Sequence, residues 1–327
     1  MSKCQPENVL RAYVAGQAKL GYAVFDPGPD ASDIILAAFP KSGSTWTSYL
    51  MQQIRSGGDD SFGDIKDEVI DITPGHWDPA VNPFRMEQRR LPRTFKTHGS
   101  YRHCPKGARY IYVARDPKDS FWSLYHFVHD LFALEERMPI EEFFTGYYVE
   151  RFGTGHDVGN VWDHFIGWFP HRDDANVLWL HYEDMLEDRA ACIKKMASFM
   201  GVELSGDVLK VVIEHSEINH MRAIASRINP SPENRVGRVV QGFGPELRGY
   251  AREMKFGKMR KGIVGDGLSG LPEKLRAALD DEWTKRITPV LGYKSYDEMR
   301  AARAVSGLRP PAGQPLRRPG TGSEREL

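Results

Sequence analysis

A lysine, a glycine and three hydroxyl residues lie between an apolar run and an amphipathic segment near the start of the chain. The apolar run covers residues 34–39, the loop follows at 40–45, and apolar spacing predicts a helix over residues 45–54. A strand, a small-residue turn and a helix N-terminus make an anion site, because unpaired backbone N–H groups and the helix dipole attract negative charge. A lysine in the loop adds to this attraction. We therefore expect a phosphate-bearing ligand here.

This loop is P-loop-like but departs from the Walker pattern. Gly-x-x-x-x-Gly-Lys-Ser/Thr places the lysine directly before the helix. Here Lys41 precedes Gly43, and no glycine opens the loop. Ser42, Ser44 and Thr45 are also residue types that merely cap a helix. Taken alone, the segment leaves both interpretations open.

Strand and helix patterns alternate along the following chain, which predicts an α/β fold with a central, mostly parallel sheet flanked by helices. Apolar and β-branched runs predict strands at 34–39, 93–97, 109–114 and 176–181. Helical spacing predicts helices over 118–131, 140–149, 158–168 and 183–200.

In a parallel sheet with right-handed crossovers, the carboxyl ends of all strands lie along one edge. Lys41, Lys96, His98, Arg115 and Tyr182 each lie at or just past the end of a predicted strand. We therefore expect these side chains to gather at that edge.

Composition and length limit the class of protein. The chain has 327 residues, 41% hydrophobic and 27% charged, with 44 basic and 44 acidic side chains. A balanced charge does not indicate nucleic acid as a partner, and no apolar stretch is long enough for a membrane span. The N-terminus lacks the apolar core of a signal peptide, and the 3 cysteines do not pair by spacing, so we expect a cytoplasmic protein.

We expect a single domain over residues 1–305. The Pro-, Gly- and Arg-rich segment 306–327 has the composition of a disordered tail. Residues 222–258 lack periodicity and are rich in Pro and Gly, which favours a loop that acts as a lid over the site.

Several short motifs occur in an order that resembles the cytosolic sulfotransferases, which use 3′-phosphoadenosine 5′-phosphosulfate (PAPS) as donor and release PAP. Residues 39–46 resemble the loop Tyr-Pro-Lys-Ser-Gly-Thr-Thr-Trp that binds the 5′-phosphosulfate. Residues 95–98 resemble the Lys-Thr-His element, and 112–127 resemble the 3′-phosphate segment. Residues 182–185 read Tyr-Glu-Asp-Met, and residues 260–266 fit Arg-Lys-Gly-x-x-Gly-Asp.

The chain also departs from this family. The usual Gly-Asp-Trp-Lys-Asn is replaced by Gly-Asp-Gly-Leu-Ser over residues 265–269. Ser216 replaces a nucleotide-contacting threonine, and Ile218 replaces the neighbouring aromatic residue, which leaves adenine stacking mainly to Trp46. The family's dimer segment is not recognisable, so the oligomeric state stays open.

The resemblance implies an enzyme and a catalytic set. His98 corresponds to the base that takes the acceptor proton, a role suited to an imidazole that titrates near neutral pH. Lys41 corresponds to the group that stabilises the departing phosphate, and Lys96 to the group that neutralises the sulfuryl oxygens.

The resemblance also implies the residues that bind the donor. Arg115 and Ser123, with residues 260–262, correspond to the 3′-phosphate site, for which a guanidinium is well suited. The full set of donor-binding residues expected is Lys41, Ser42, Gly43, Ser44, Thr45, Trp46, Arg115, Ser123, Tyr182, Ser216, Arg260, Lys261 and Gly262.

The acceptor expected from the resemblance is a small lipophilic molecule with a hydroxyl or amine group. Phe127, Trp77 and Phe243 are candidates for its pocket. No metal is expected, because the histidines lack His-x-x-x-His or His/Cys spacing and two lysines already provide cationic charge.

Three other interpretations remain at the level of sequence. A nucleotide or small-molecule kinase would need a Walker-type loop and a carboxylate for magnesium. A non-catalytic module that binds PAP or another nucleotide would need neither Lys96 nor His98. A relative that sulfates an alcohol only transiently, to activate it for dehydration, would share all of these motifs.

Overall fold

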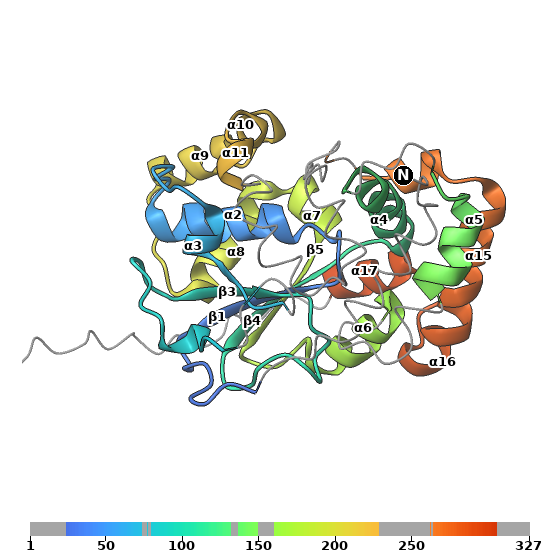
Figure 1. Ribbon diagram of the computed structural model, residues 1–327, viewed down its shortest axis with the longest axis horizontal. Coiled ribbons are helices and arrows are strands. Elements are labelled where there is room, and N and C mark those ends of the chain that lie inside the picture. Colours follow the sequence, from blue (N-terminus) through green and yellow to red (C-terminus); the bar gives the residue numbers. More distant parts are fainter. Residues whose placement is uncertain are drawn as a thin grey trace, which may run out of the picture.

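A parallel β-sheet lies at the centre of the computed structural model (Figure 1). The structure describes residues 24–73, 77, 80–131, 137–149, 160–228, 262 and 264–305. Within these residues the sheet has five strands in the order β2-β3-β1-β4-β5, and each neighbouring pair is parallel. The strands are β1 (Ile34–Ala38), β2 (Ile70–Asp71), β3 (Thr94–Thr97), β4 (Arg109–Ala114) and β5 (Val177–His181).

Both faces of the sheet are buried, and the strand residues alternate between two apolar cores. In β1, Ile35 and Ala37 belong to one core, while Ile34, Leu36 and Ala38 belong to the other. β4 and β5 alternate in the same way. This two-sided burial explains why the strands read as continuous apolar runs in the sequence.

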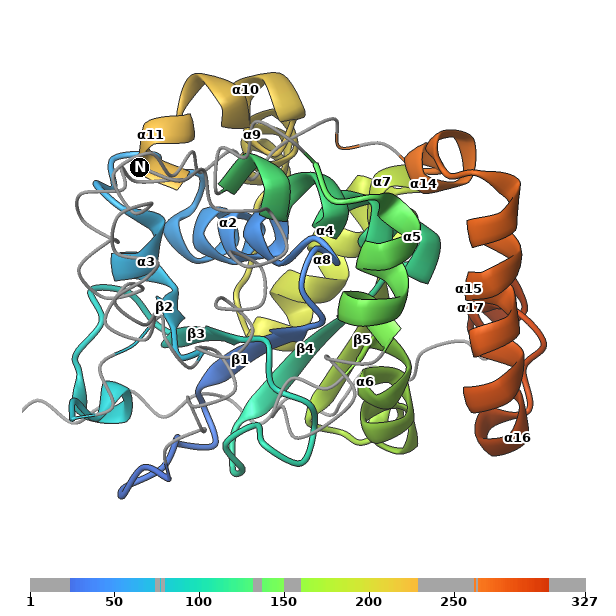
Figure 2. The ribbon, with the colours of Figure 1, turned by 45° about the vertical axis from the view of Figure 1, so that its right-hand side comes forward.

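One face is covered mainly by α2 and α8, and the other by α4 and the C-terminal helices. Figure 2 shows α9–α11 lying over α2 and α3, and the C-terminal helices at the opposite side of the molecule. The helices on the first face are α2 (Ser44–Ser56), α3 (Ile65–Glu68), α7 (Tyr182–Glu187), α8 (Arg189–Met200), α9 (Gly206–His215), α10 (Ile218–Ala223) and α11 (Ala225–Ile228). The second group comprises α4 (Pro117–Leu131), α5 (Ile140–Phe143), α6 (Val161–Trp168), α14 (Asp266–Gly270), α15 (Glu273–Arg286), α16 (Thr288–Leu291) and α17 (Tyr296–Val305).

The strand order creates a switch in chain direction at the carboxyl edge of the sheet, between β1 and β4. β1 lies between β3 and β4, and the chain leaves β1 for α2 on one face and β4 for α4 on the other. Open α/β sheets bind their ligands at such a switch in chain direction. The loops after β1 and β4 therefore leave neighbouring strands at this switch point.

The predicted fold class and all four predicted strands are confirmed, with ends that differ by at most one residue. The two-residue edge strand β2 was not predicted, because so short a run has no periodicity. The prediction of a single helix over residues 183–200 is wrong. The segment forms two helices, because Asp188 ends α7 and caps α8 by accepting a hydrogen bond from the Ala191 amide at 2.9 Å.

Other predicted segments differ in part. The helix over 140–149 continues from α5 into a π-helical turn (Phe144–Val149), and α6 begins after the Asn160 cap. The first residues of the segment 222–258 are helical in α10 and α11 rather than a loop. Its residues from 229 onward and the tail 306–327 lie outside the described residues. Among the described helices, none combines the length and apolar character needed to cross a bilayer.

Candidate active site

The loop between β1 and α2 has an unusual backbone. Lys41 has φ 69 and Gly43 has φ 95, so two residues adopt the left-handed region within one short turn. A non-glycine residue rarely takes this conformation, and such strain is concentrated at functional sites. Gly43 is the N-cap of α2, and among the described residues no side chain caps this helix. The capping interpretation of the loop hydroxyls is therefore wrong, and within the described part of the chain the first N–H groups of α2 have no side-chain acceptor.

Glycine is required at position 43 by a close contact as well as by its φ. A Cβ atom there would lie 2.5 Å and 2.8 Å from ring atoms of Tyr182. Tyr182 begins α7 directly after β5, as expected for a residue at the strand end. The ring of Trp46 meets the ring of Tyr182 edge to face with centroids 5.6 Å apart. The loop, Tyr182 and Trp46 thus form one packed unit.

Arg115 connects this unit to α4. Its Nη1 donates a hydrogen bond to the carbonyl oxygen of Lys41 at 2.9 Å, and its guanidinium lies 4.3 Å from the centroid of the Tyr182 ring. Its Nη2 lies 3.4 Å from Oδ2 of Asp119. The two predicted cationic residues are therefore brought together, since the Arg115 side chain contacts the backbone of Lys41.

Asp119 was not predicted as a site residue, but it holds the backbone at the start of α14, where the motif of residues 260–266 ends. Its carboxylate accepts hydrogen bonds from the amides of Gly267 at 2.7 Å and Gly265 at 3.0 Å. A Cβ at Gly267 would lie 2.4 Å from the carbonyl oxygen of Lys118. Glycine in place of the family's tryptophan is thus what allows α14 to pack directly on α4.

Gly262 lies beside the substituted aromatic position. It has φ 67, and a Cβ there would be 3.3 Å from Cδ1 of Ile218. Trp46 reaches the same corner, because its Nε1 donates to the carbonyl oxygen of Ser216 at 3.0 Å. The Ser216 hydroxyl donates to the carbonyl oxygen of Ile213 at 2.7 Å. The structure therefore joins Ser216, Trp46 and Gly262 at one corner of the site.

Lys96 is buried and paired. Its Nζ lies 2.9 Å from Oδ2 of Asp71, and the side chains are 8% and 4% exposed. Asp71 belongs to the unpredicted strand β2, next to Lys96 in the sheet register. The carboxylate compensates the charge of a lysine that is almost completely withdrawn from water.

His98 is fixed through its ring and its backbone. Its Nδ1 lies 2.7 Å from the carbonyl oxygen of Ala38, and its amide donates to Oγ1 of Thr73 at 3.1 Å. Because a carbonyl oxygen only accepts, Nδ1 carries the proton and Nε2 carries the lone pair of the neutral ring. Ala38 ends β1 just before the loop of Lys41, so this contact places the imidazole beside that loop.

His164 is a further group that the sequence did not single out. It is buried in α6, and its Nε2 lies 3.2 Å from the carbonyl oxygen of His98. Its Nδ1 lies 3.1 Å from the Tyr112 hydroxyl. Burial lowers the pKa of His164 to about 4, so the ring stays neutral and supports the His98 backbone as a donor.

The structure describes some of the remaining candidates for the acceptor pocket and the donor site, and others lie outside the described residues. The Nζ of Lys41 lies 3.9 Å above the centroid of the Phe127 ring, so this aromatic side chain borders the site. Ser123 is half-buried one turn earlier on α4. Trp77 packs against the core and donates from Nε1 to the carbonyl oxygen of Val81 at 2.6 Å. Phe243, Arg260 and Lys261 lie outside the described residues.

Comparison with known proteins identifies the class. Residues 31–288 match the model of the Sulfotransferase domain family. The amine sulfotransferase of Oryctolagus cuniculus is 31% identical over 241 residues, which cover 72% of this chain and 73% of that protein. The sulfotransferase 1E1 of Mus musculus is 27% identical over 272 residues, covering 78% and 83%.

Solved structures show the same fold. Mouse sulfotransferase SULT7A1 complexed with PAP aligns with a TM-score of 0.56 and 20% identity, covering 85% of this chain and 90% of that chain. Retinol dehydratase in complex with androsterone and PAP aligns with a TM-score of 0.59 and 19% identity, covering 84% of each chain. The chain belongs to the sulfotransferase family, and the predictions of this family and of a sulfotransferase enzyme are confirmed.

Proposed function

We propose that the enzyme transfers the sulfuryl group of PAPS to a hydroxyl or amine of a small lipophilic acceptor, with His98 as the base. The observation that carries this proposal is the 2.7 Å contact between His98 Nδ1 and the Ala38 carbonyl oxygen. It leaves the lone pair on Nε2 and holds the ring next to the loop of Lys41. Family membership supports sulfuryl transfer as the reaction, and PAP in the solved relatives supports the donor.

The proposed step is an in-line displacement at sulfur. The acceptor oxygen or nitrogen forms a bond to sulfur, the bond from sulfur to the bridging oxygen breaks, and PAP leaves with the electron pair. The acceptor proton passes to Nε2 of His98. Lys41 stabilises the negative charge that develops on the departing phosphate, as in other transfers of this type.

Lys96 neutralises the sulfuryl oxygens in this proposal. Its Nζ now contacts Asp71 at 2.9 Å, so the lysine must share its charge between this carboxylate and the donor. A lysine with three donor protons can bind both partners at once. Asp71 therefore positions Lys96 before the donor arrives.

The donor's phosphates are assigned to two cationic regions. The N–H groups and hydroxyls of residues 42–45, together with Lys41, would hold the 5′-phosphate. Arg115 and Ser123 would hold the 3′-phosphate, with Arg260, Lys261 and Gly262 from the later motif. Trp46, Tyr182 and Ser216 would border the nucleoside.

The acceptor and the cellular location are also proposals. Phe127 over Lys41 supports an apolar group next to the reacting centre, and similarity to an amine sulfotransferase supports amines beside hydroxyls. We propose a cytoplasmic enzyme, which agrees with the free buried thiols of Cys104 and Cys192.

His98→Asn tests the proposal most sharply. The asparagine amide nitrogen can replace Nδ1 as donor to the Ala38 carbonyl oxygen, but it offers no group in place of Nε2. We expect transfer from radiolabelled PAPS to phenols, sterols or aliphatic amines to fall by about 10²–10⁴-fold. PAP affinity by calorimetry should stay nearly unchanged, as it should in His98→Ala.

His171→Gln is the matched control, since this histidine pairs with Asp174 away from the site and its loss should not change transfer. Equal activity in wild type and His98→Asn would refute the base assignment. Binding of PAP but not ATP, with transfer that survives EDTA, separates this function from the kinase alternative. If wild type binds PAP but transfers sulfate to none of these acceptors, the result would favour the non-catalytic nucleotide-binding module.

A further inference from the structure

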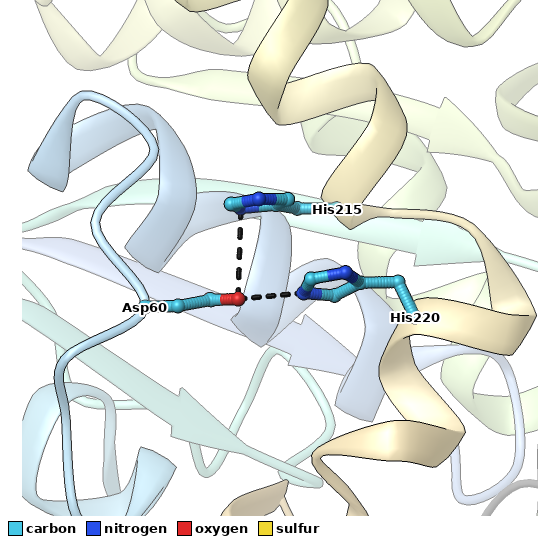
Figure 3. A group of neighbouring side chains, drawn as sticks. All are labelled: Asp60, His215 and His220. Carbon is cyan, nitrogen blue, oxygen red and sulfur yellow. Dashed lines mark hydrogen bonds and ion pairs between the residues drawn. The ribbon is translucent and has the colours of Figure 1, made fainter.

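Two histidines and a carboxylate meet outside the donor site (Figure 3). Asp60 lies in the loop between α2 and α3, His215 ends α9, and His220 lies in α10. His220 Nε2 is 2.6 Å from Oδ2 of Asp60, and His215 Nδ1 is 3.6 Å from the same oxygen. All three side chains are 19–29% exposed, so an ion from solvent can reach them.

We propose that Asp60, His215 and His220 bind a divalent transition-metal ion such as Zn²⁺. One atom from each residue lies within 4.8 Å of the others. Zinc binds imidazole nitrogen and carboxylate oxygen at about 2.0–2.2 Å, which separates neighbouring ligand atoms by about 3.3 Å in a tetrahedral site. The 2.6 Å and 3.6 Å separations lie on either side of this value.

The carboxylate is already oriented for such a ligand role. Oδ1 of Asp60 accepts hydrogen bonds from the Tyr49 hydroxyl at 2.6 Å and from Nε2 of Gln53 at 2.7 Å. These contacts fix the carboxylate and turn Oδ2 toward the two histidines. Hydrogen bonds to the second oxygen of a ligating carboxylate are typical of protein metal sites.

Metal entry requires a small rearrangement of the two imidazoles. The rings of His215 and His220 are stacked, with centroids 4.2 Å apart and planes inclined by 15°. His215 Nδ1 now contacts Oε1 of Gln53 at 2.8 Å. Metal entry breaks the hydrogen bonds from His220 Nε2 to Asp60 and from His215 Nδ1 to Gln53, and in each ring the proton moves through solvent to the other nitrogen. His215 then turns out of the stack, so that the lone pairs of both rings converge on the ion. One water molecule would complete a four-coordinate site, and two would complete a five-coordinate site.

The chemistry of the ligands selects the metal. Two imidazoles with one carboxylate suit Zn²⁺, Co²⁺, Ni²⁺ or Cu²⁺, whereas Mg²⁺ and Ca²⁺ prefer oxygen ligands alone. The guanidinium of Arg227, which donates to the backbone oxygen of Asp60, reduces the attraction for a cation. The site is separate from the proposed sulfuryl transfer and takes no part in that chemistry.

The ion would link segments that are far apart in the sequence. Asp60 and His220 are separated by 160 residues, and His215 and His220 flank the corner that carries Ser216 and Ile218. Residues 215 and 220 are five positions apart, a spacing that neither a search for His-x-x-x-His nor one for His/Cys pairs detects. The structure therefore shows a candidate site where the sequence predicted no metal.

Calorimetric titration of chelator-treated protein with ZnCl₂ tests the proposal. We expect wild type to bind one Zn²⁺, and His215→Gln and His220→Gln each to weaken binding at least tenfold. His171→Gln is the matched control, because it removes another histidine that pairs with a carboxylate, at 2.8 Å from Asp174, and it should bind like wild type. Wild type that binds Zn²⁺ no more tightly than His215→Gln and His220→Gln would overturn the proposal.

A second measurement does not depend on the variants being folded. Histidine Cε1–H signals of wild type are followed by NMR during the Zn²⁺ titration. Two of these signals should shift together up to one equivalent, and a titration in which no histidine signal shifts would contradict the site.

Discussion

Lys41 combines a charge with a backbone conformation that few residues adopt. Its φ of 69 turns the chain so that its carbonyl oxygen reaches Arg115, while its Nζ lies over Phe127. The side chain can therefore move to a ligand without any change in the turn itself. This arrangement separates the positional role of the backbone from the electrostatic role of the ammonium group.

Lys41→Ala should weaken PAP binding and reduce transfer, because the 5′-phosphate and the leaving group both lose their nearest cation. Lys41→Arg keeps the charge and should retain more PAP affinity than the alanine variant. Calorimetry with PAP and transfer from labelled PAPS measure the two effects. Equal PAP affinity in Lys41→Ala and wild type would contradict the assignment of the loop.

Gly43→Ala should damage both folding and donor binding. The new Cβ would meet the Tyr182 ring at 2.5 Å and would hold alanine at φ 95, a conformation that costs about 1–3 kcal/mol. Urea unfolding and PAP calorimetry measure the two losses. Gly146→Ala is the control, since a Cβ there has no atom within 4 Å. If Gly43→Ala and Gly146→Ala had the same free energy of unfolding and the same PAP affinity, the packing of Tyr182 on the loop would have no role in stability or donor binding.

The residues that gather at the sheet edge could be predicted, and their partners could not. Parallel strands place Lys96 and Arg115 at one edge whatever surrounds them. The partners Asp71 and Asp119 follow only from sheet register and helix packing, which short motifs do not encode. The Asp60 cluster likewise depends on how α9 and α10 lie against the loop after α2.

At the scale of elements, Glu183 connects three helices. Its Oε1 accepts from the Asp116 amide at 3.1 Å at the start of α4, and its Oε2 accepts from the Tyr296 hydroxyl of α17 at 2.5 Å. The Tyr296 oxygen also lies 3.0 Å from Nδ1 of His181 at the end of β5. This network holds α7, which carries Tyr182, in place.

Burial raises the pKa of Glu183 from 4.5 to about 7, which predicts a pH-dependent stability. The folded state then holds a proton that the unfolded state releases, so its contribution is present below pH 4.5 and is lost as pH rises to about 7. Glu183→Gln should remove this dependence. The free energy of unfolding of wild type, relative to the variant, should fall by at most about 3 kcal/mol between pH 5 and 8.

Urea unfolding of both proteins at several pH values measures this difference. A constant difference across the range would show that Glu183 titrates normally in the folded protein. Since the comparison is made within one pair of proteins, titrating groups remote from Glu183 cancel to first order.

Some elements were predictable and others were not, for physical reasons. β1, β4 and β5 are buried on both faces, which produces the apolar runs visible in the sequence. β2 is only two residues long, and its pairing with β3 depends on the rest of the sheet. The break at Asp188 did carry a signal, since aspartate is a preferred N-cap, but a continuous helical spacing concealed it.

At the scale of the whole molecule, the formal charge is zero, while Lys41, Lys96 and Arg115 lie at or near the carboxyl ends of strands. A zero formal charge provides no general attraction for an anionic donor, so the proposed donor binding would depend on the local charge of these residues. The order β2-β3-β1-β4-β5 puts β1 next to β4, and this brings the loop of Lys41 into contact with Arg115.

A crystal structure of the chain with PAP tests the central claim most directly. The account predicts the 5′-phosphate on the backbone amides of residues 42–45 and the 3′-phosphate within about 3 Å of the Arg115 guanidinium. Nε2 of His98 should face the end of the 5′-phosphate from which the sulfuryl group departs. A nucleotide bound away from these residues, or one that contacts Lys41 but leaves Arg115 and His98 remote, would contradict the account.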